Sequence, residues 1–186
     1  MKIDLAFDAR AVRLQLDRIP QQIIAPAAVR ALNRTLTSAR SASVKKVRTA
    51  LPLSAKSIRG RLALERATRS KLVAAIVAKR DYDPGLYLFA PKWRQKQPGG
   101  ATIKMPGRPR QIVSGAFVAR TSYGRDAVFR RIGRSRRPIK FLRASDVGLP
   151  TIASAFLQAV ADGAFKRLTR DTFRRNFAAE LKFRAS

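Results

Sequence analysis

The sequence predicts an α+β fold, with a long N-terminal helix, a central antiparallel β-sheet with a projecting basic loop, and C-terminal helices, as a single domain over residues 1–186. A stretch without proline or glycine favours one long helix at residues 27–51. Short β-branched and aromatic runs between turn signals favour strands within residues 111–143. Apolar residues at helical spacing follow Pro150, and a hydrophobic content of 46% suffices for a core.

A short strand and a helix are expected to open the chain. Residues 2–7 alternate between apolar and polar side chains, which is typical of a half-buried strand. Asp8 can then cap a helix in which Val12, Leu16 and Ile19 recur at the spacing i, i+4 and i+7. The chain therefore enters its long helix from a strand and a first helix.

The long helix at residues 27–51 should run for about seven turns. Pro20 and Pro26 stand where a helix can begin, since proline lacks only an N–H that the first turn does not use. One face carries small and apolar side chains, which allow close packing, and the opposite face carries basic ones. We expect the small-residue face to be buried and assign it to packing between copies of the chain. Its members are Ala28, Ala31, Leu32, Thr35, Ala39 and Ala42.

Shorter elements should follow. Ser54 can cap a helix that ends at Arg61. Residues 71–79 fit a buried strand of alternating small and branched side chains, although their alanines also permit a helix. Residues 83–85, Asp-Pro-Gly, form a turn because proline fixes φ and glycine permits a positive φ. Residues 86–90 then fit either a further strand or an apolar anchor.

Residues 91–110 have a different composition, with four prolines and three glycines among lysines and arginines. Such a segment favours an extended basic loop or hairpin, with its tip near Gly99 and Gly100. We expect this loop to project from the body of the domain.

A β-meander should come next, with strands at residues 111–120, 126–132 and 139–143. Residues 92–143 contain fifteen basic residues and one acid, which is +14 of the net charge of +29. A charge of this size indicates a polyanion or an acidic protein surface as partner. The residues that we expect to contact a nucleic acid or an acidic partner are Lys92, Arg94, Lys96, Lys104, Arg108, Arg110, Arg120, Arg125, Arg130, Arg131, Arg134, Arg136, Arg137 and Lys140.

Two interpretations of this basic meander stay open. Most of its cations are arginines, whose planar fork suits bidentate phosphate contacts. A solvated face or contacts with proteins would need the same residues. Trp93, Tyr123, Phe129 and Phe141 could stack on bases, but core packing or loop anchoring is the simpler explanation for them.

The C-terminal helical segment should cover residues 150–183, where Gly163 either breaks the helix or weakens it. Phe165, Phe173, Phe177 and Leu181 fall on one row at multiples of four residues. We interpret that row as core, ahead of a seam against a neighbouring subunit.

Catalysis is not expected. The chain has no cysteine and no histidine, which excludes disulfides, the usual zinc sites, thiol nucleophiles and imidazole bases. Asp81 and Asp83 flank a turn and are interpreted as turn-forming acids rather than a hydrolytic pair. No glycine pattern cradles a phosphate ahead of a helix. We therefore predict no enzyme activity, catalytic residue, metal or cofactor. The sequence also contains no apolar run of the roughly 20 residues that are needed to span a bilayer.

Four motifs in order point to a known family. They are ALNR at residues 31–34, SGAFVAR at 114–120, VFRRIG at 128–133 and RRPI at 136–139, followed by an arginine-rich tail. Over roughly residues 20–182 the chain resembles the minor tail protein Z family, the tail completion proteins of lambda-like long-tailed phages. The commonest family form has proline where this chain has Ser114.

The resemblance implies a structural virion protein in the tail neck of a siphovirus, assembled in the host cytoplasm. Such a protein completes the head-proximal end of the tail and supports head-tail joining and positioning of the genome end. The implied partners are further copies in a ring, with six as the natural extrapolation, neighbouring tail terminator, tail tube or neck proteins, and the double-stranded DNA genome end.

The competing hypothesis is a cellular nucleic-acid-binding protein of ribosomal or nucleoid type, which would share the charge and the lack of cysteine and histidine. Neighbouring genes for head-tail joining and tail tube proteins would separate the two. A nuclease is the weaker third hypothesis, because metal-dependent hydrolysis needs clustered carboxylates.

Overall fold

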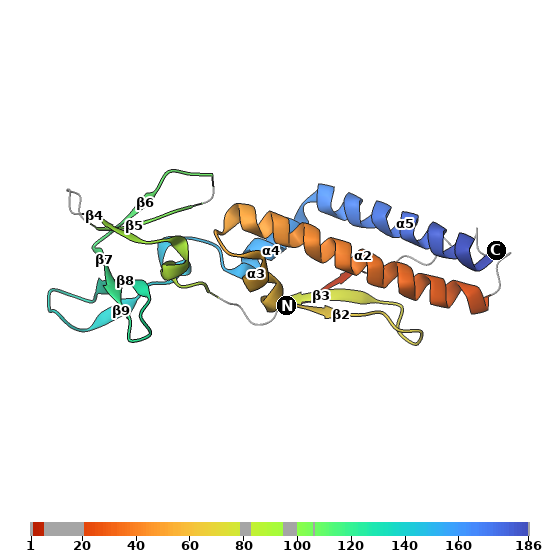
Figure 1. Cartoon of the computed structure of the whole chain (residues 1–186), viewed down its shortest axis with the longest axis horizontal. Coiled ribbons are helices and arrows are strands. Elements are labelled where there is room, and N and C mark those ends of the chain that lie inside the picture. Colours follow the sequence, from red (N-terminus) through yellow and green to blue (C-terminus); the bar gives the residue numbers. More distant parts are fainter. Residues whose placement is uncertain (1, 6–20, 79–82, 95–99, 106, 186) are drawn as a thin grey trace.

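The computed structural model describes residues 2–5, 21–78, 83–94, 100–105 and 107–185. The molecule is elongated, with two long helices along one end and two small sheets at the other (Figure 1). The α+β class is confirmed. The helix expected after Asp8 lies outside the described residues.

The long helix α2 spans Gln21–Ala50, so it begins six residues earlier than the predicted Ala27. Pro26 is the sixth residue of this helix, where proline lacks the N–H that would donate to the carbonyl four residues earlier. The short helix α3 spans Ala55–Arg61, and the Ser54 hydroxyl accepts a hydrogen bond from the Ser57 N–H at 3.1 Å. The predicted cap is therefore confirmed.

The C-terminal segment forms α4, Ile152–Ala161, and α5, Gly163–Ala185. The helix is interrupted between them at Asp162. The Asp162 carboxylate accepts a hydrogen bond from the Ala164 N–H at 2.9 Å and so caps α5. Helix α5 packs antiparallel along α2 (Figure 1). Its phenylalanine row is in the core, which confirms that interpretation. Phe165, Phe173 and Phe177 are buried and Leu181 is partly buried.

The first sheet consists of β1, Lys2–Leu5, β2, Leu62–Glu65, and β3, Ala74–Ala78, in the antiparallel order β1-β3-β2. Strand β3 is largely buried and contacts α2. The strand interpretation of residues 71–79 is therefore confirmed and the helical alternative is wrong. Strand β2 was not predicted, because four residues of sequence LALE suit a helix as well as a strand.

The second sheet consists of β4, Lys92–Arg94, β5, Gly100–Ile103, and β6, Gln111–Ser114, in that order. The predicted basic loop thus contains an antiparallel hairpin, β4 against β5, and β5 is buried along its length. The part of this hairpin between Arg94 and Gly100 lies outside the described residues.

The third sheet is the predicted meander, with β7, Ala116–Arg120, β8, Asp126–Arg131, and β9, Ile139–Phe141. The strand expected at residues 111–120 is divided at Gly115, where φ is +67°. Residues with a Cβ adopt this conformation only with strain, so glycine permits the turn that sends β6 and β7 into different sheets. Three small sheets therefore take the place of one central sheet.

The 3₁₀ turn η1, Leu86–Phe89, lies between the second and third sheets and the long helices (Figure 1). The strand interpretation of residues 86–90 is wrong, and the anchor interpretation is confirmed because Leu86 and Phe89 are fully buried. The Leu86 N–H donates to the Leu142 carbonyl at 3.1 Å, and the Lys104 N–H donates to the Phe89 carbonyl at 2.8 Å. This turn thereby holds the ends of β5 and β9 together.

Candidate polyanion interface

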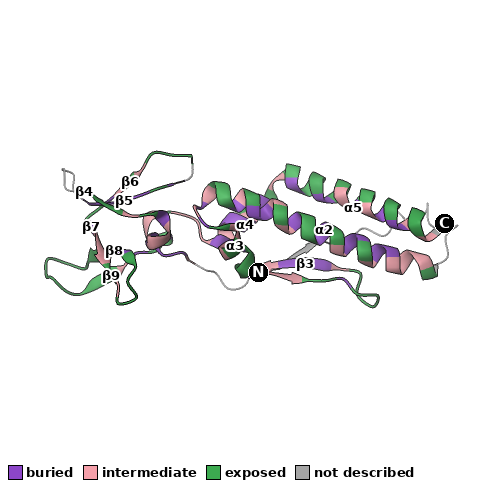
Figure 2. Ribbon diagram, viewed as in Figure 1, coloured by how far each residue is buried: buried purple, intermediate pink, exposed green. Residues whose placement is uncertain are grey.

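The predicted basic residues lie on the second and third sheets and their connections, and Lys104, just after β5, also lines a pocket with Arg48 of α2. Lys96 falls outside the described residues, and Arg94 is described only as part of β4. Figure 2 shows that the loops of the third sheet are exposed. The remaining twelve residues separate into cations that bond within the chain and cations that do not.

Arg110 is bonded within the chain. Its guanidinium donates from Nε to the Thr102 hydroxyl at 3.1 Å, and from Nη2 to the Thr102 carbonyl at 3.1 Å and to the Ala90 carbonyl. Ala90 has a positive φ of 47°, a conformation that L-residues rarely adopt. Arg110 therefore stabilises the turn between η1 and β4, and its hydrogen-bonding capacity is largely used there.

Three cations of the third sheet are also engaged. Arg120 Nε donates to the Gly124 carbonyl at 3.2 Å, and Arg130 Nη2 donates to the Ser114 carbonyl at 3.3 Å. The Arg131 guanidinium lies 5.8 Å from the centre of the Phe117 ring, within range of a cation–π contact. These side chains hold turns and strand ends in place.

Lys140 lies directly opposite Arg130 in the β8–β9 pair, where two like charges repel each other. Asp146 relieves this repulsion, since one of its carboxylate oxygens lies 2.6 Å from Lys140 Nζ. That hydrogen bond, followed by a second from the Arg143 N–H, holds the pKa of Asp146 below its ordinary value. Lys140 is thus a partly neutralised cation.

Seven of these cations have no side-chain hydrogen bond or ion pair inside the described part of the chain, and most of them lie in loops. Arg125 is in the β7–β8 turn, and Arg134, Arg136 and Arg137 are in the β8–β9 turn, where all four are exposed. Lys92, Lys104 and Arg108 are also exposed. These seven side chains are available for a partner, and the β8–β9 turn carries the densest group.

A row of aromatic rings crosses the third sheet, which the sequence pattern did not reveal. Phe117 and Phe129 are 5.9 Å apart, Phe129 and Phe141 are 5.8 Å apart, and Tyr87 follows at 6.2 Å from Phe141. Gly85 makes room for the last pair, because a Cβ there would lie 2.5 Å from the Phe141 ring and 2.6 Å from the Tyr87 ring. Of the four aromatic residues considered for base stacking, Phe129 and Phe141 contact each other. The other two are exposed, Trp93 by 53% and Tyr123 by 89%.

The face expected to pack between copies is covered within the chain itself. Most of its six residues are buried, and only Ala42 is partly buried. Helix α5 contacts α2 more extensively than any other element does, and the Asn176 amide of α5 donates to the Thr35 hydroxyl of α2 at 3.1 Å. These residues therefore reach their buried state without a second copy.

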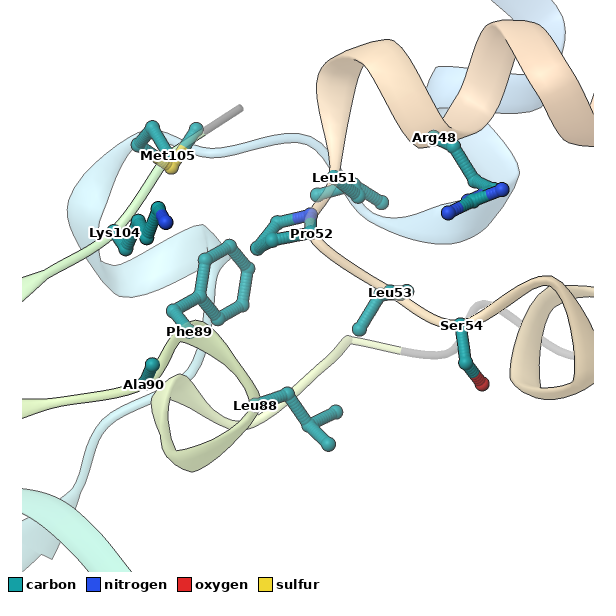
Figure 3. Close-up of a pocket in the computed structure, with 10 residues that line it drawn as sticks. All are labelled: Arg48, Leu51, Pro52, Leu53, Ser54, Leu88, Phe89, Ala90, Lys104 and Met105. Atoms are coloured by element: carbon teal, nitrogen blue, oxygen red, sulfur yellow. The ribbon is translucent and has the colours of Figure 1, made fainter. Parts of the chain in front are cut away.

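A pocket of about 450 Å³ lies where the helical end meets the sheet end (Figure 3). Leu51 and Leu53, which follow α2, line it together with Phe89 and Met105. Arg48 and Lys104 lie on opposite sides of it, and Lys104 was predicted as a contact residue while Arg48 was not.

Among the described residues, no group of three or more acids, cysteines or histidines could hold a metal ion. No helix in the described part of the chain has the length and apolar character to cross a membrane.

Comparison with known proteins places the chain in a family. No curated protein and no solved structure matches it. The family model of the prophage minor tail protein Z (GPZ) matches residues 9–184, which is nearly the whole chain. The chain belongs to the prophage minor tail protein Z family, whose members are minor tail proteins of phages.

Proposed function

We propose that this protein is a structural, non-enzymatic component of the virion that completes the head-proximal end of the tail. Membership of a minor tail protein family carries the proposal. The grouping of unpaired cations at one end of an elongated molecule supports it, because such an end suits the junction where a tail meets packaged DNA.

We further propose that several copies act together as a ring in the neck, with the whole chain as one domain. Their contacts would use surfaces outside the α2–α5 interface, which is already filled within the chain. The neighbours would be tail terminator, tail tube or neck proteins. The basic sheet end would face the end of the double-stranded DNA genome.

Deleting the gene tests this function. We expect particles with tails of normal length that are defective in joining heads or in delivering DNA, and plating efficiency restored by the gene supplied in trans. Electron microscopy and plating of the deletion phage measure both. Normal infectivity without the gene would refute the proposal. Purified virions that contain no copies of the chain would refute it as well.

A further inference from the structure

The β8–β9 turn forms a hairpin arm with an unusual surface. Residues 131–140 are all exposed, and the Ile132 N–H donates to the Pro138 carbonyl at 3.0 Å to close the turn. The five residues between them are Gly-Arg-Ser-Arg-Arg. The tip therefore carries three arginines and no apolar side chain.

The base of this arm is fixed, while its tip makes no bond to the other described residues. Val128 and Leu142 are buried beneath it, and the Leu142 N–H donates to the Val128 carbonyl at 2.9 Å. The Phe129 and Phe141 rings pack edge to face above them, at 5.8 Å. The three tip arginines have no hydrogen bond or ion pair with any described residue. A rigid base thus presents three free guanidinium groups.

We infer that this arm enters the major groove of double-stranded DNA and contacts the phosphates on its two sides, independently of sequence. The inference rests on the proposed function and names the segment that contacts the genome end. A two-stranded ribbon fits the major groove, which is about 12 Å wide, whereas the minor groove of about 6 Å would have to widen. The planar fork of arginine matches a phosphate.

The composition of the tip favours DNA over an acidic protein. Protein interfaces are enriched in aromatic side chains and methionine as well as in arginine, and their cores are largely apolar, whereas the tip offers arginine alone. Its apolar residues stand only at the base, where Ile132 is 56% exposed and Ile139 is 44% exposed. Ile132 and Ile139 lie where the groove walls would contact the ribbon. On binding, the arm would bury apolar area at its base and arginine side chains at its tip.

The experiment measures binding of the full chain to a fluorescent duplex of about two helical turns, as salt is raised. The test variant is Arg134→Ala, Arg136→Ala and Arg137→Ala together. The matched control is Arg167→Ala, Arg170→Ala and Arg174→Ala, which removes the same charge from exposed positions of α5. Circular dichroism confirms that both variants are folded.

We expect the log-log salt slope of the tip variant to fall by about 2.7, since each phosphate contact contributes about 0.9. The control should retain most of the wild-type slope. Two sequences of equal length should bind equally well. Netropsin, which occupies the minor groove, should not displace the protein.

Several results would overturn the inference. Equal loss of slope in both variants would mean that only overall charge matters. Displacement by netropsin would place the arm in the minor groove, and the absence of salt-dependent binding by the wild type would point to an acidic protein partner. Each of these results leaves the deletion phenotype unaffected, so failure of this inference is distinct from failure of the proposed function.

Discussion

The helical end and the sheet end of this protein are both strongly basic, yet they use their cations differently. In the helical end, Glu180 of α5 is buried, with its carboxylate 2.8 Å from Arg34 and 3.8 Å from Arg30 of α2. Lys46 pairs with Asp162 at the other end of the same helix pair. These acids are positioned so that the cations of α2 connect it to α5.

The sheet end has almost no acid to serve this purpose. Asp126 is the one acid among fifteen basic residues in residues 92–143. Guanidinium groups there bond to backbone carbonyls, as Arg110 and Arg130 do, contact a ring, as Arg131 does, or extend into solvent, as at the β8–β9 tip. The role of an arginine in this chain therefore depends on whether a carboxylate or a backbone carbonyl lies within its reach. Substitutions should therefore affect folding at one end and binding at the other.

The largest effect should come from separating the two ends. Phe89→Ala removes a fully buried ring at their junction, and such a truncation costs about 3–5 kcal/mol of unfolding free energy. Phe117→Ala is the control, because that ring is only partly buried on the outer face of the third sheet, and it should cost less. Urea unfolding measures both. Equal losses would show that the burial of Phe89 at the junction contributes no more stability than a partly buried ring of the third sheet.

A smaller effect should distinguish the two arginines of the helical end. Arg34→Ala leaves the buried Glu180 carboxylate without its close partner, which costs about 1.5–3 kcal/mol. Arg30→Ala removes only a contact of 3.8 Å to the same carboxylate and should cost less than about 1 kcal/mol. Urea midpoints compare the two variants. If both lose the same stability, long-range charge rather than the close pair holds α5.

Much of the fold could be predicted because periodicity reports directly on burial. The buried faces of α2 and α5 follow from spacing alone, whereas spacing left residues 71–79 open between a strand and a helix, and pairing in the first sheet decides for the strand β3. The division at Gly115 could not be predicted, since a glycine in a strand pattern indicates either a bulge or a break, and distant pairing decides which. Likewise, β2 is a strand because β3 lies beside it, which a local pattern does not reveal.

The candidate site was predictable by region but not by role. An excess of arginine located the basic end, yet nothing in the sequence separates Arg110, which bonds to Thr102 and Ala90, from the exposed Arg108. Asn33 of the ALNR motif shows the same limit. Its amide donates to the Ala67 carbonyl at 3.1 Å and accepts from the Ala67 N–H at 2.9 Å, across 34 residues of chain. Such roles depend on distant backbone atoms.

The smallest effect concerns Asp146, the acid that partly neutralises Lys140 at the base of the arm. Hydrogen bonds from Lys140 and from the Arg143 N–H lower its pKa below the ordinary value of 3.8. A lowered folded-state pKa means that the carboxylate stabilises the native state above its unfolded pKa, and that this contribution is lost as pH falls through the folded pKa. Asp146→Asn should therefore lower stability near neutral pH by less than about 1 kcal/mol, because Lys140 is half exposed.

The difference in unfolding free energy between Asp146→Asn and the wild type should stay constant from about pH 7 to about pH 5. It should disappear below the ordinary pKa of the Asp146 carboxyl. Urea midpoints measured across that range test it, with Phe89→Ala as a control whose deficit comes from lost apolar burial and should not depend on this titration. Added salt should narrow the Asp146→Asn gap, since the pair is near the surface. A gap that persists below the folded pKa would show that the asparagine perturbs the turn at Ser145–Val147, rather than removing a charge from the base of the arm.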